Sequence, residues 1–112
     1  MSETISVYMT ASSQDEARRV AEALIESRLA ACVNILGSVQ SMFNWDGVQR
    51  EQEVALLAKA SRADFDALNA KVRAVHSYDC PCVVGWPIAE GDSEFTRWIV
   101  AETRGQRGGE PG

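Results

Sequence analysis

The chain has 112 residues, 46% of them hydrophobic, and a formal net charge of −5. This length fits one domain with one small core. The negative charge argues against nucleic acid as a partner, because nucleic-acid-binding domains usually present a basic surface. The sequence shows no apolar run long enough for a membrane-spanning helix and no secretory signal, so we expect no membrane partner. Three cysteines, an odd number, favour reduced thiols and a cytoplasmic location.

The first predicted elements are a strand and an amphipathic helix. Apolar residues alternate with polar or small ones over residues 5–9, a pattern typical of a strand. Ser13 and Glu16 then have the spacing of a capping box, which satisfies free amides at the start of a helix. Apolar residues follow at helical spacing and predict a helix over residues 14–29 with one buried face.

A long β-hairpin is the next predicted element. Residues 33–45 carry the longest alternating pattern, Asp46 and Gly47 signal a two-residue turn with positive φ values, and a second strand returns through the apolar residues 54–57. Each arm could be about ten residues or longer, against a usual strand of about five or six. Its outer end would then expose apolar side chains and unpaired backbone groups. Either the pattern overstates the strands, or the hairpin pairs with another subunit; we favour the second interpretation.

The second half of the chain predicts a helix, a strand and a last helix. Ser61 and Asp64 mark a capped helix start, and this helix is expected to end near His76. A strand is expected over residues 81–88, and the last helix over residues 94–102. The large apolar side chains expected in the core here are those of Phe95, Trp98 and Ile99 in the last helix and of Trp86 in the strand.

The predicted order is strand-helix-strand-strand-helix-strand, followed by a terminal helix. It indicates an α+β protein with the ferredoxin-like sandwich, in which two helices cover one antiparallel sheet. We expect a single domain over residues 1–103, with an extended β-hairpin and a C-terminal helix. Residues 104–112 are rich in glycine, proline and charge, and are predicted to form a disordered tail.

Four segments resemble those of the CutA divalent-cation tolerance proteins. They are RLAACVNI (28–35), SMFNWDG (41–47), HSYDCP (76–81) and GDSEFTRW (91–98), and the resemblance extends over nearly all of residues 4–102. It implies a ferredoxin-like fold and a homotrimer whose long hairpins pair across subunits. It also implies a link to tolerance of copper and other divalent metals, with no established catalytic reaction. A similar trimeric architecture occurs in the PII nitrogen-signalling proteins.

Three positions depart from the usual pattern of that family. Val48 stands where lysine commonly follows the hairpin turn, and Ser77 stands where proline is common. Cys82 stands where a glutamate usually follows Pro81. This last change removes a carboxylate and adds a thiol, so a sulfur-based metal site becomes more favourable there and an oxygen-based one less favourable.

Residues 76–82, HSYDCPC, hold the only histidine and two of the three cysteines. His76, Cys80 and Cys82 are candidate metal ligands, and imidazole with thiolates favours Cu(I) or Zn(II). Their spacing is not a standard zinc motif. The alternative is that a charged His76 ends the second helix favourably while the cysteines pack as small apolar side chains. Cys32, flanked by alanines, is either simply buried or joins this segment in a trimer.

A second set of candidates, Tyr78, Glu53 and Trp45, would line a cleft between subunits. Otherwise Glu53 is a solvated or edge-strand charge, and Trp45 is expected to pack on a neighbouring chain. Common catalytic motifs are missing from the sequence, so we expect no enzyme activity. The favoured hypothesis is a homotrimer of CutA type that binds copper or another divalent metal and has no obligatory cofactor. The alternative is a PII-like regulatory trimer that binds a small ligand or a partner protein in the cleft.

Overall fold

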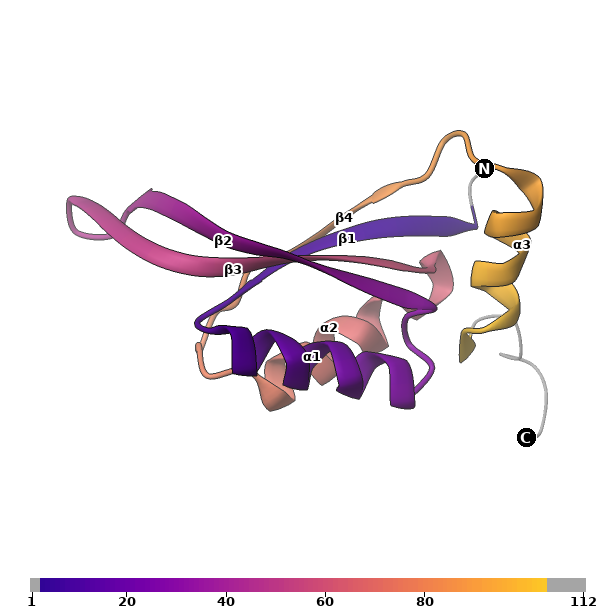
Figure 1. Cartoon of the computed structure of the whole chain (residues 1–112), viewed down its shortest axis with the longest axis horizontal. Helices are drawn as coiled ribbons and strands as arrows, with labels where there is room; N and C mark the ends of the chain where they lie inside the picture. The colour runs from indigo at the N-terminus through magenta and orange to yellow at the C-terminus, as the bar shows by residue number, and fades with distance from the viewer. Residues whose placement is uncertain (1–2, 105–112) are drawn as a thin grey trace.

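The computed structural model describes residues 3–104 and shows a sheet with helices beside it (Figure 1). The order of elements confirms the predicted ferredoxin-like α+β arrangement with a terminal helix. None of the helices in this part of the chain is long and apolar enough to cross a membrane. The elements are β1 (Thr4–Ala11), α1 (Gln14–Glu26), β2 (Cys32–Asn44), β3 (Val48–Ser61), the short 3-10 helix η1 (Arg62–Asp64), α2 (Phe65–Val75), β4 (Val83–Pro87) and α3 (Ser93–Ala101).

The four strands form one antiparallel sheet in the order β2-β3-β1-β4. α1 and α2 cover one face of this sheet, whereas α3 lies at the end where β1 begins (Figure 1). β1 is a central strand, and its apolar Ile5, Val7 and Met9 are at most 5% exposed, as the alternating pattern predicts. The core residues that the two covering helices contribute are Ala17, Val20, Leu24, Leu68 and Val72.

α1 ends at Glu26, before the position that the apolar spacing predicts. Arg28 takes a left-handed backbone conformation with φ of 61°. The amide of Leu29 donates to the carbonyl of Leu24 at 2.9 Å, a bond typical of a Schellman helix end. Leu29 remains buried against the end of the helix, so the apolar spacing continues although the helix does not. Glycine usually marks such a helix end in a sequence, so the arginine at this position did not indicate that the helix ends here.

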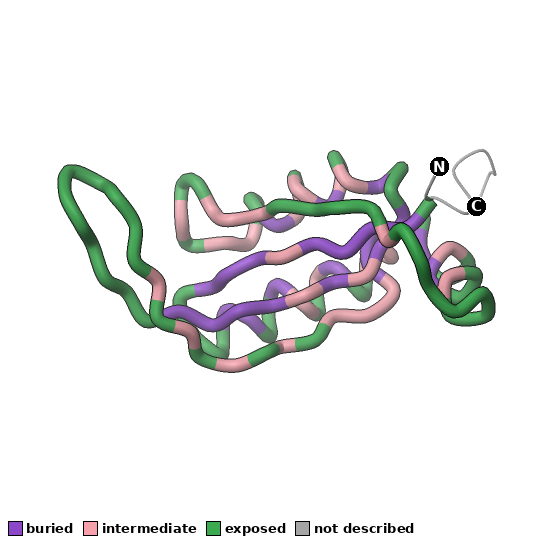
Figure 2. The backbone as a smooth tube through the Cα atoms, turned by 90° about the horizontal axis from the view of Figure 1, so that it is seen from above, coloured by how far each residue is buried: buried purple, intermediate pink, exposed green. Residues whose placement is uncertain are grey.

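The long hairpin is confirmed, because β2 has 13 residues and β3 has 14. Asp46 and Gly47 have the predicted positive φ values, 58° and 101°, but the ladder ends at the pair Asn44 and Val48, so the loop has three residues instead of the predicted two. β1 ends opposite Val54, so in the described part of the chain no third strand lies beside the outer half of the hairpin. Both arms are exposed there (Figure 2). The large apolar side chains that face solvent on it are Met42, Phe43, Trp45 and Val48.

The predicted capping of the second helix is wrong. Neither Ser61 nor Asp64 makes a side-chain capping hydrogen bond at η1 or at α2. The Ser61 hydroxyl instead bonds to the hydroxyl of Thr103, which is fully buried just after α3. The Ser61 hydroxyl, which the sequence spacing had assigned to helix capping, therefore bonds to the residue that follows the terminal helix instead.

The prediction that three aromatic side chains enter the core is also wrong. Phe95 and Trp98 are 44% and 42% exposed, and their rings contact each other with centroids 5.5 Å apart. Trp86 is 48% exposed on the edge strand β4. Ile99 alone of the expected set is buried, because α3 turns only a narrow face toward the body of the protein.

The predicted disordered tail begins at Arg104, which the structure describes. Its amide donates to the carbonyl of Arg28 at 2.8 Å, so the backbone of this residue is tied to the end of α1. The rest of the predicted tail, residues 105–112, lies outside the described residues.

Candidate functional site

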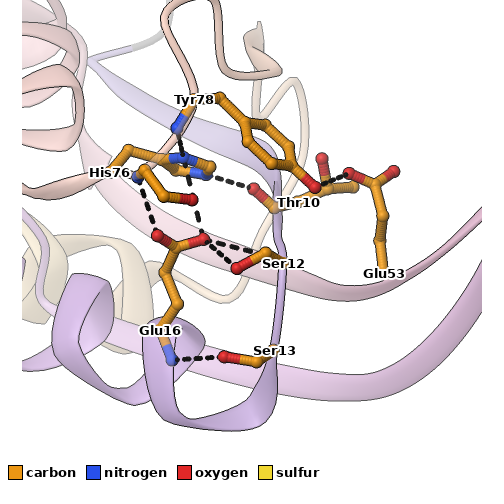
Figure 3. A network of polar contacts seen from close by, with 8 residues as sticks. Thr10, Ser12, Ser13, Glu16, Glu53, His76 and Tyr78 are labelled. Carbon is orange, nitrogen blue, oxygen red and sulfur yellow. Dashed lines mark hydrogen bonds and ion pairs between the residues drawn. The ribbon is translucent and has the colours of Figure 1, made fainter.

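The loop after α2 places the imidazole of His76 against the end of β1 (Figure 3). Its Nε2 lies 2.8 Å from the carbonyl oxygen of Thr10, and its Nδ1 lies 3.0 Å from the amide nitrogen of Tyr78. A carbonyl only accepts and an amide only donates, so Nε2 carries the proton and Nδ1 accepts. The His76 side chain is 1% exposed. The ring is thus turned toward β1 and hydrogen-bonded there, which corrects the expectation that its charge acts on the end of the helix.

Glu16 ties this loop to the start of α1 (Figure 3). Its carboxylate accepts hydrogen bonds from the amide and the hydroxyl of Ser12, both at 2.8 Å, and from the amide of Ser77 at 2.7 Å. Its own amide donates to the Ser13 hydroxyl at 3.1 Å, which confirms that half of the capping box. The other half differs, because the carboxylate returns to Ser12 rather than to the cap residue.

The carboxyl group of Glu16 is only 1% exposed and still remains ionised. Burial alone would raise its pKa, but hydrogen bonds from the amides and hydroxyls of Ser12 and Ser77 outweigh burial and lower the pKa to about 2. Oε1 also lies 3.8 Å from Nδ1 of His76. Glu16 is therefore a fixed acceptor that holds two loops together at neutral pH.

Tyr78 connects the same loop to β3. Its hydroxyl donates to Oε2 of Glu53 at 3.0 Å, and its ring lies 4.7 Å from that of His76 (Figure 3). Glu53 faces Val39 in the ladder, just beyond the part of β3 that pairs with β1. The Tyr78–Glu53 bond thus links the loop to the hairpin at the point where the hairpin leaves the four-stranded sheet.

Tyr78 should stay un-ionised until about pH 12. Burial raises its pKa to about 12, with further contributions from the hydrogen bond to Glu53 and from nearby carboxylates, because all of them disfavour a phenolate. The ultraviolet titration of the wild type minus that of Tyr78→Phe should show tyrosinate absorbance with a midpoint near pH 12. Circular dichroism at each pH controls for unfolding. A midpoint near 10, the ordinary value, would show that the phenol is freely solvated.

The thiols are not gathered around His76. Cys80 is exposed, whereas Cys82 and Cys32 are partly buried. Burial, and then the charge of Glu53, raise the pKa of the Cys82 thiol. Across residues 3–104, no three histidine, cysteine, aspartate or glutamate side chains are close enough to hold a metal ion. The predicted metal ligands therefore do not form a closed site within one chain.

The structure brings together three predicted site residues and adds one that the sequence had indicated only as a helix cap. Cys32 lies at the start of β2 opposite Lys59, and Trp45 is 73% exposed at the tip of the hairpin, so both are outside this network in a single chain. The residues of this network, the Glu16 network, are Glu16, Glu53, His76 and Tyr78.

The arrangement from β1 to the end of α3 matches a known family. A family model described as CutA1 divalent ion tolerance protein matches residues 5–102. The chain belongs to the CutA family. The resemblance of the four sequence segments is thereby confirmed. The protein named divalent-cation tolerance protein CutA in Thermus thermophilus is 43% identical over 98 residues, which cover 87% of this chain and 95% of the relative. That of Archaeoglobus fulgidus is 42% identical over 94 residues, which cover 83% of this chain and 91% of the relative.

Solved CutA structures have the same fold. The divalent cation tolerance protein Cut A1 of Thermus thermophilus superposes with a TM-score of 0.88 at 42% identity, covering 89% of this chain and 98% of that one. CutA1 of Oryza sativa superposes with a TM-score of 0.89 at 36% identity, covering 92% and 95%. The cellular locations given for CutA relatives differ: a rice relative is named chloroplastic, and the Archaeoglobus structure is described as periplasmic.

Proposed function

We propose that this CutA-family protein is a non-enzymatic homotrimer of the cytoplasm that contributes to divalent-cation tolerance by binding copper. The observation that carries the proposal is the outer half of the hairpin, where Met42, Trp45 and Val48 are 67–73% exposed. A single chain leaves this large apolar surface in water, which favours its burial against other copies. The alternative of a PII-like regulatory module gains no comparable support, because the matching family is described by divalent ion tolerance.

For the metal, we assign Cys80 and Cys82 as the donors and His76 as a positioning residue. Both ring nitrogens of His76 are already hydrogen-bonded, and its side chain is 1% exposed, so ligation through either nitrogen would break at least one of these hydrogen bonds. Cys80 is exposed and Cys82 is partly so, and Pro81 between them favours an extended backbone. Thiolates favour Cu(I), and since one chain supplies only two of them, further donors would come from a neighbouring subunit or from solvent.

An anaerobic titration of the reduced protein with Cu(I), in the presence of a competing chelator, tests this assignment. We expect saturable binding by the wild type and loss of at least about tenfold in affinity in Cys80→Ser/Cys82→Ser, because the soft donors are removed. Cys32→Ser should bind like the wild type if Cys80 and Cys82 are the donors, whereas weaker binding would place Cys32 of a neighbouring subunit among them. His76→Ala should weaken binding less than the double variant does. Equal binding by the double variant and the wild type would contradict the assignment.

A further inference from the structure

A second feature lies at the opposite end of the molecule from the Glu16 network. It is a hollow of about 260 Å³ between β4, the beginning of β1 and the beginning of α2. The Glu16 network, in contrast, surrounds the end of β1 and the loop after α2. The hollow is lined by Ile5, Arg62, Phe65, Gly85, Trp86 and Pro87.

The floor and walls of the hollow are mostly apolar. Ile5 pairs with Pro87 and Val7 pairs with Gly85, and directly paired residues face the same side of a sheet, which here is the side of the helices. A Cβ atom on Gly85 would lie 3.3 Å from the carbonyl oxygen of Ser6, 3.4 Å from Cγ2 of Val7 and 3.6 Å from Cε1 of Phe65. The absence of a side chain on Gly85 therefore lets the ring of Phe65 pack close to β4, where it forms one side of the hollow.

One free positive charge stands at the hollow. Arg62 is exposed, and its guanidinium makes no hydrogen bond or ion pair with the part of the chain that the structure describes. The amides at the start of α2 add positive potential, and neither Ser61 nor Asp64 caps them with a side chain. A guanidinium can bind a carboxylate through two parallel hydrogen bonds.

Size and charge limit what could bind. The volume lies just below the range of about 300–1,000 Å³ typical of sites for drug-sized ligands, so the occupant has about one ring. The net charge of −5 and the acidic Asp64 and Asp66 at this end of α2 disfavour a ligand with several negative charges. The single positive charge of Arg62 matches a ligand with one negative charge.

We propose that this hollow is a binding site for a small monocarboxylate with a flat apolar body, of which benzoate is the simplest probe. The ring would lie against Phe65 and Pro87, and the carboxylate would meet Arg62. This site is separate from the copper role, because none of its lining residues belongs to the Glu16 network or to the cysteine segment.

The test is a titration of the ¹⁵N-labelled full chain with benzoate, followed by amide chemical shifts, with benzyl alcohol as the neutral analogue. We expect saturable shifts confined to the amides of residues 5, 62–65, 85 and 86, with a Kd on the order of 1 mM for so small a ligand. Arg62→Ala and benzyl alcohol should each weaken binding about tenfold or more, because each removes one partner of the charge pair. Arg19→Ala, on the exposed face of α1, is the matched control and should bind like the wild type.

Gly85→Val supplies a second variant, because its side chain would displace the ring of Phe65 into the hollow and should abolish the shifts in a protein that still melts cooperatively. If this variant does not fold, Arg62→Ala still decides the question. The proposal is overturned if Arg62→Ala binds benzoate as tightly as the wild type, or if benzyl alcohol binds as tightly as benzoate. It is also overturned if the shifts map to another region or fail to saturate by about 20 mM.

Discussion

Glu16→Gln is expected to lower the free energy of unfolding by about 3 kcal/mol. The folded protein holds the pKa of this carboxyl at about 2 instead of 4.5, and that interval corresponds to about 3 kcal/mol of preference for the ionised form. Glutamine keeps the shape of the side chain but loses the charge that Ser12 and Ser77 donate to. Urea unfolding of both proteins at one protein concentration measures the difference, since assembly also affects apparent stability.

The pH dependence identifies the cause of this loss. A lowered folded-state pKa stabilises the protein fully above the ordinary pKa of 4.5, and the stabilisation disappears as pH falls toward about 2. The difference between wild type and Glu16→Gln should therefore be constant near neutral pH and shrink from about pH 5 downward. Glu22→Gln, on the exposed face of the same helix, should change stability by no more than about 0.5 kcal/mol. A difference that does not vary with pH would mean that packing, and not charge, holds Glu16 in place.

Local patterns were sufficient for the elements of the fold. The alternating residues of β2, the positive φ values at Asp46 and Gly47, and the cap at Ser13 each depend on a few neighbouring residues, and the structure confirms all three. The end of α1 at Arg28 was missed, because an arginine in the left-handed conformation has no distinguishing spacing. Phe95 and Trp98 were predicted to lie in the core because they are large and apolar. Apolar character alone does not show whether a side chain is buried within its own chain, and both are partly exposed here.

The candidate site could not be predicted from local patterns, because it is formed by contacts between segments that are distant in the sequence. The Ser77 amide that meets Glu16 is 61 residues away in sequence, and the Thr10 carbonyl that occupies His76 is 66 residues away. The spacing of Ser13 and Glu16 indicated a helix cap, but nothing local showed that the same carboxylate would hold a second loop. Neither could the sequence show that both nitrogens of His76 are satisfied, which is why a histidine beside two cysteines was read as a metal ligand.

Replacing Met42, Phe43 and Trp45 together with serine is expected to convert the assembled protein into a folded monomer. Full burial of a large apolar side chain contributes about 1.5–3 kcal/mol, so covering the exposed parts of these three would contribute about 3–5 kcal/mol per chain, which the changes would remove from the assembly. The monomer itself should lose little stability, because these side chains are 70%, 43% and 73% exposed in a single chain. Sedimentation velocity at micromolar concentration measures the mass, and circular dichroism measures the retained fold.

The matched control changes three exposed polar residues of the same hairpin, as Arg50→Ser, Glu51→Ser and Gln52→Ser. It alters the same hairpin to a similar extent but removes no large apolar side chain, so it should sediment as the wild type does. A wild type that is itself a monomer would refute assembly through the hairpin. If the apolar variant remains a trimer, the copies must meet through other surfaces, of which the exposed rings of Trp86, Phe95 and Trp98 are the largest that remain. The hairpin would then owe its length to some property other than contact between subunits.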